Sequence, residues 1–170
     1  MSPTLRWLAR GSAVGIVVFC AGLWVYVFLI ADAHPPDKLK GKAFPAAAAP
    51  VCKDALDKVY AGNLYFAKAK TPQDQGQLVA QANVILKAMV AQLKSLPTPT
   101  DSEDARVVAG WLDDWDVFLG DRDAWATKLQ AGEPAVFYVH SHEGGTPVSD
   151  AMDSFSIANG LDDCKTPNGY

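Results

Sequence analysis

The sequence predicts an all-α protein: a single N-terminal transmembrane helix, then an extracytoplasmic antiparallel helical bundle of three long helices and one short helix. Three observations lead to this fold class. Residues 12–31 carry no charge, apolar residues recur at steps of three and four in later segments, and Cys52 and Cys164 bracket those segments. The predicted parts are a cytoplasmic N-terminus (1–11), a transmembrane helix (12–31), a Pro/Ala-rich tether (32–50) and an extracytoplasmic helical domain (51–170).

Composition and charge exclude some classes of protein. Apolar residues make up 49% of the 170 residues, which is enough for a packed core. The net charge is −4, and the first 31 residues contribute Arg6 and Arg10 but no acid. The rest of the chain is therefore acidic and repels phosphate groups, so we expect no nucleic-acid partner.

The uncharged run over residues 12–31 is long enough to cross the roughly 30 Å hydrocarbon layer of a bilayer as a helix. Arg6 and Arg10 precede it, which favours a cytoplasmic N-terminus. We therefore expect a single-pass protein of the plasma membrane, with lipid around residues 12–31. The alternative is a cleaved signal peptide, because Ala31 and Ala33 fit a small-x-small site, but the apolar run exceeds the usual length of about 7–15 residues.

The cysteines agree with a location outside the cytoplasm, which both the retained transmembrane helix and the cleaved signal peptide predict. An oxidising compartment permits Cys52 and Cys164 to pair. Because the connections are short, sequential helices should be antiparallel, and this order places Cys164 at the same height in the bundle as Cys52. We therefore predict a disulfide between them. Cys20 lies within the predicted span, where we interpret it as a small apolar residue.

Helix signals divide the domain. Thr71 and Pro72 suit the N-cap and first position of a helix, and residues 100–103 form a capping-box pattern. Residues 34–50 contain four prolines and a run of alanines, which we interpret as an extended spacer. The predicted helices cover residues 51–69, 72–96, 102–131 and 147–159.

The third predicted helix has the sharpest pattern in the chain. Seven of its residues alternate by steps of three and four, which predicts a narrow seam that faces neighbouring helices. These residues are Val108, Trp111, Trp115, Phe118, Arg122, Trp125 and Leu129. Its aspartates, including Asp113 and Asp116, are interpreted as a solvated face. Residues 134–142 have a strand-like composition, but no second strand is evident.

Two sets of residues are candidates for chemistry. His140 and His142 lie two apart in an extended segment and could share a zinc or copper ion with Glu143, but a solvated turn before two glycines is the favoured interpretation. Arg122 lies in an aromatic seam, where a guanidinium must be paired or stacked. We expect a structural role with a carboxylate partner from the first or fourth helix, rather than an anion-binding cleft.

Residues over about the last 60 positions also carry a resemblance. They are Asp114, Trp115, Leu119, Asp121, Arg122, Trp125, Ala126, Leu129, Gly132, Phe137, Asp153, Phe155, Asn159, Cys164 and Pro167. On these residues the chain resembles a set of small actinobacterial membrane-anchored or exported proteins with no assigned activity. The resemblance implies a location in the bacterial cell envelope, and that Arg122, Asp153 and Asn159 form one structural set.

The sequence contains no recognisable catalytic motif, so we expect neither an enzyme nor a cofactor. The predicted function is an extracytoplasmic accessory or scaffold protein of the cell envelope, for example as a subunit of a larger membrane complex, with a membrane-protein partner. The alternative is a metal- or small-molecule-binding envelope domain that uses His140 and His142 or a cleft near Arg122.

Overall fold

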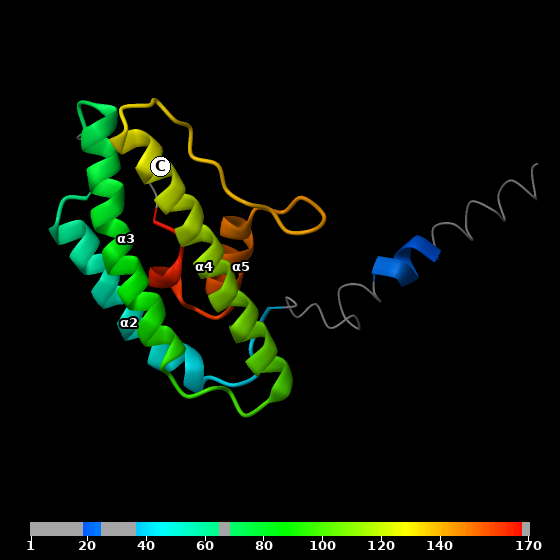
Figure 1. Ribbon diagram of the computed structural model, residues 1–170. Coiled ribbons are helices and arrows are strands. Elements are labelled where there is room, and N and C mark those ends of the chain that lie inside the picture. The colour runs from blue at the N-terminus through cyan, green and yellow to red at the C-terminus, as the bar shows by residue number, and fades with distance from the viewer. Residues whose placement is uncertain (1–18, 25–36, 65–68, 168–170) are drawn as a thin grey trace, which may run out of the picture. The chain divides into compact units, whose positions relative to one another are not determined.

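A computed structural model describes residues 19–24, 37–64 and 69–167 (Figure 1). The chain divides into two compact units, Met1–Pro36 and Asp37–Tyr170. In the first unit, residues 19–24 are helical. The rest of the predicted span 12–31, together with the alternative cleavage site after Ala33, lies outside the described residues. Among the residues that the structure describes, no helix has the length and apolar character needed to cross a membrane.

The second unit is built from helices, as predicted. They are α2 (Ala43–Ala61), α3 (Pro72–Lys94), α4 (Ser102–Gln130), α5 (Val148–Ala158) and the 3₁₀ turn η3 (Asp162–Cys164). In Figure 1, α3 lies beside both α2 and α4, and α5 lies on α4. The described part of the chain contains no strand beyond an isolated bridge between Ser141 and Pro147, so the all-α class is confirmed there.

The predicted tether over residues 32–50 is wrong in its second half, because α2 begins at Ala43 rather than near Val51 and ends at Ala61. Alanine has the highest helix propensity of all residues, and a buried stripe runs along this helix from Phe44 to Val59. Pro50 lies inside the helix without ending it. The helical domain therefore starts well before residue 51.

The segment before α2 is also attached to the bundle. The buried carboxylate of Asp104 on α4 accepts hydrogen bonds from the backbone N–H groups of Lys40 (3.0 Å) and Gly41 (2.9 Å). Asn159 accepts a bond from the Leu39 N–H and donates one to the Asp37 carbonyl, both at 2.9 Å. These four bonds fix the chain from Asp37 onward.

The predicted bounds of α3 and α4 are confirmed to within two residues. Thr71 is the N-cap of α3 and accepts from the Asp74 N–H, while Asp101 caps α4. The two helices approach each other closely at Gly76. A Cβ atom there would lie 2.8 Å from the backbone nitrogen of Gln130, so the contact requires glycine.

The core lies along the inner face of α4. All seven residues of the predicted seam are buried. The aromatic rings among them contact Phe44 on α2, Phe155 on α5 and Phe137 in the connection after α4. Cys52 on α2 and Cys164 on η3 are fully buried and form the predicted disulfide, with Cα atoms 5.0 Å apart. This bond joins the middle of α2 to the C-terminal 3₁₀ turn.

Candidate functional site

The connection between α4 and α5 runs as an extended segment along α4 (Figure 1). The indole Nε1 of Trp125 donates to the Ala135 carbonyl at 2.7 Å, and the Phe137 ring packs against Trp125 with centroids 5.1 Å apart. Alternate residues point outward, so that Val136 and Tyr138 are 93% and 79% exposed. The strand-like composition therefore produces an extended segment packed on a helix, and not a sheet.

His140 and His142 fasten the end of this segment to α4, each through its own aspartate. The His140 ring Nδ1 lies 2.5 Å from Asp121, whose other oxygen accepts the His140 backbone N–H at 2.8 Å. The His142 ring Nε2 lies 3.2 Å from Asp114, two helical turns before Asp121. Among the described residues no group of three His, Cys, Asp or Glu side chains could hold a metal ion. The described contacts of the two histidines therefore attach the extended segment to α4.

Arg122 is buried, as predicted, and its guanidinium carbon lies 5.7 Å from the centre of the Phe118 ring. The described hydrogen bond differs from the expected one. The Nε of Arg122 donates at 2.7 Å to the carboxamide oxygen of Asn83 on α3, and the amide nitrogen of Asn83 donates at 2.8 Å to Asp123. This described partner is an amide on α3, the helix that packs most closely on α4, and it was not among the partners expected from the sequence.

Asp153 and Asn159 act at the ends of the domain. Asp153 accepts hydrogen bonds from the backbone N–H and the hydroxyl of Thr166, at 2.7 and 3.1 Å, and so fixes the chain beyond η3. Asn159 fixes the segment before α2, as described above. The described bonds show two attachment points on α5 and a hydrogen bond between Arg122 and Asn83, and the expectation that Arg122, Asp153 and Asn159 form one set stays a prediction.

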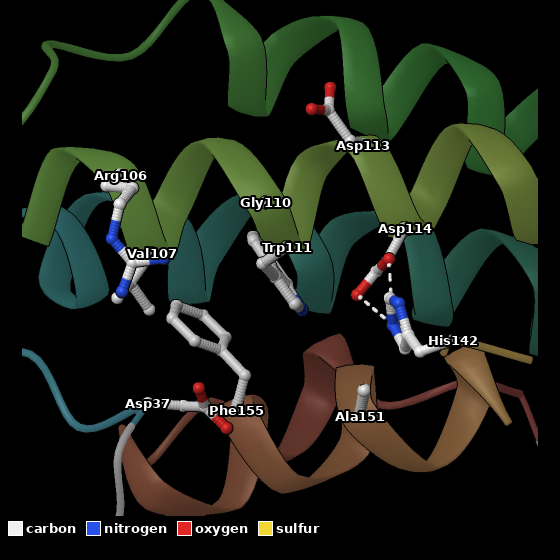
Figure 2. A pocket seen from close by; sticks show the side chains of 10 residues that line it. All are labelled: Asp37, Arg106, Val107, Gly110, Trp111, Asp113, Asp114, His142, Ala151 and Phe155. Atoms are coloured by element: carbon white, nitrogen blue, oxygen red, sulfur yellow. Dashed lines mark hydrogen bonds and ion pairs between the residues drawn. The ribbon is translucent and has the colours of Figure 1, made fainter. Parts of the chain in front are cut away.

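The structure also contains a cavity of about 350 Å³ between α4 and α5, which sequence reasoning missed (Figure 2). Its floor is formed by Trp111 and Phe155, whose rings stack with centroids 4.7 Å apart. Asp37 and Asp114 lie toward opposite ends of it in Figure 2. Three separate segments supply these residues, and no local pattern in the sequence connects them. We call this space the α4–α5 cavity.

Asp114 is a carboxylate of this cavity whose pKa is shifted by its surroundings. Burial raises its pKa above the ordinary aspartate value, and the negative charges of Asp113 and Asp37 add to this shift. His142 acts in the opposite direction. Ionised Asp114 is therefore an incompletely compensated charge beside an aromatic floor.

Comparisons with protein-family models, with curated proteins and with solved structures found no match. The resemblance to actinobacterial envelope proteins therefore stays a prediction.

Proposed function

We propose that this protein is a membrane-anchored extracytoplasmic accessory or scaffold protein of the bacterial cell envelope, which acts by contact with a membrane-protein partner and without catalysis. The observation that carries the proposal is the buried Cys52–Cys164 disulfide. Structural disulfides persist in oxidising compartments and are rare in the cytoplasm, so the bond favours an extracytoplasmic domain. The uncharged run over residues 12–31 supports an anchor in the membrane.

The short connection between anchor and domain supports a partner in the membrane. Only residues 32–36 separate the predicted span from Asp37, where the bonds to Asn159 begin to fix the chain. Even fully extended, so few residues reach no more than about 20 Å. A domain held on such a connection is available to proteins of the same membrane.

The extended segment after α4 is the contact surface that we favour. Val136 and Tyr138 expose large apolar side chains there, and Ile157 on α5 is 62% exposed. Tyrosine is enriched among residues that contribute strongly to protein interfaces. The bonds of Trp125, His140 and His142 hold the segment in place, which reduces the ordering cost of binding.

Site-specific photo-cross-linking in cell membranes tests this proposal. We expect a benzophenone amino acid at Tyr138 to give a discrete cross-linked species that contains a membrane protein. The same probe at Lys128, an exposed position near the end of α4, is the matched control and should give no such species. Identical patterns at the two positions, or no adduct at Tyr138, would contradict a contact surface on this segment.

A further inference from the structure

We propose that the α4–α5 cavity binds a small organic cation that carries a primary ammonium or guanidinium group. Its volume of about 350 Å³ lies within the range of small-molecule sites. It combines an aromatic floor with carboxylates that reach it from the chain before α2 and from α4. This inference concerns a different part of the domain from the contact surface around Tyr138, so the two can fail separately.

The charge around the cavity is negative. Arg106 is the one guanidinium among the described lining residues, and it is held by Glu103 through bonds of 2.6 and 3.2 Å. Asp37, Asp113 and Asp114 also line the cavity. These three carboxylates outnumber Arg106 and His142 together, so the local field attracts a cation and repels an anion.

Asp114 is the group that we expect to contact the cation. Its side chain is 17% exposed and lies beside His142 at the edge of the cavity (Figure 2). The charged or titratable groups that act on it are His142, Asp113 and Asp37, and Arg106 lines the same cavity about two turns earlier on α4. Burial disfavours its ionised form, and an arriving ammonium group would compensate that charge. A charge-assisted hydrogen bond at such a position is stronger than one at an open surface.

The aromatic floor suits the same ligand class. Trp111 and Phe155 extend toward each other from α4 and α5, stack on each other and are 3% and 2% exposed, so they form an apolar floor that suits the hydrocarbon part of such a ligand (Figure 2). The indole Nε1 of Trp111 is buried and has no hydrogen-bond partner in the described part of the structure. Buried N–H groups in native proteins nearly always have a partner. A ligand with an oxygen acceptor beside its cationic group would supply one.

Three probes of one length test the charge preference. Isothermal titration of the full-length protein, in mild detergent, compares 5-aminopentan-1-ol with the anion 5-hydroxypentanoate and with neutral 1,5-pentanediol. We expect saturable binding of the amino alcohol alone. Its affinity should fall as the pH is lowered through the raised pKa of Asp114, because protonation removes the carboxylate charge. The proposal is overturned if the amino alcohol does not bind, or if the anion or the diol binds equally well.

Three variants locate the site. Asp114→Asn should weaken binding of 5-aminopentan-1-ol about tenfold, since it removes an ionised partner. Asp37→Asn keeps the backbone carbonyl that Asn159 binds, and should weaken binding about threefold. Asp116→Asn is the matched control, because Asp116 is an exposed α4 residue paired with Lys94 outside this cavity, and it should leave the affinity unchanged. Equal losses in the Asp116 and Asp37 variants would show that binding does not occur in this cavity.

Discussion

Replacing both Cys52 and Cys164 by alanine should lower the free energy of unfolding by about 4–5 kcal/mol, which is the largest effect that we expect from any change outside the aromatic core. The bond joins residues that are 112 positions apart, so it removes a large loop entropy from the unfolded chain. Both sulfur-bearing residues are fully buried, between α2 and η3. Their loss would therefore also release the C-terminal end of the domain.

Denaturant unfolding of the purified full-length protein measures this effect. The wild-type midpoint should fall when a reductant is added, whereas the midpoint of the double variant should not respond. Cys20→Ser is the control, because it removes a cysteine that is free in the structure and should leave the unfolding midpoint unchanged. Equal midpoints for the wild type and the double variant under oxidising conditions would contradict a stabilising disulfide.

Asn83→Leu should lower the free energy of unfolding by about 3 kcal/mol. Asn83 is 1% exposed and accepts the hydrogen bond of the Arg122 Nε. Removing the amide takes that acceptor away from a buried guanidinium, which costs more than losing an exposed hydrogen bond. The change also removes the bond to Asp123. Gln92→Leu, at an exposed position on the same helix, is the control and should change stability by less than about 0.5 kcal/mol.

A double-mutant cycle tests whether Arg122 and Asn83 act as a pair. Replacing both residues by apolar side chains, as in Asn83→Leu/Arg122→Leu, should recover most of the stability that Asn83→Leu loses, because no guanidinium then remains buried. Arg122→Leu alone should change stability and leave cross-linking at Tyr138 intact. If the effects of the two single changes simply add, the two side chains are not coupled and Arg122 has another principal role.

The long helices could be predicted because their signals are local. Thr71 caps α3 as predicted, and Asp101, one residue after the Thr100 of the predicted capping box, caps α4, each through a side chain two or three residues from the groups it binds. The seam of α4 is a periodic pattern that needs no knowledge of its partner. The start of α2 was missed because its prolines and alanines also suit a spacer. Only the packing of Phe44 and Ala48 into the core decides between the two.

The polar contacts could not be predicted in the same way. Arg122 required a partner, but only the packing of α3 against α4 selects Asn83, 39 residues earlier in the chain. His140 and His142 were recognised as a pair, yet their contacts with Asp121 and Asp114 depend on how the connection lies along α4. The α4–α5 cavity requires four segments to meet: the chain before α2, α4, the connection with His142, and α5. Such sites follow from tertiary structure, and composition and spacing do not indicate them.

The most direct test of the proposed function is the side of the membrane on which the domain lies. In a Cys20→Ser background, single cysteines are introduced by Lys128→Cys and Ser2→Cys, and cells without a wall are treated with a membrane-impermeant maleimide. Lys128 is exposed and lies outside the contact surface proposed around Tyr138, so a cysteine there stays reachable when a partner is bound. Our account expects labelling of the Lys128→Cys variant on intact cells and of the Ser2→Cys variant only after lysis. Labelling of the Lys128→Cys variant only after lysis would contradict it.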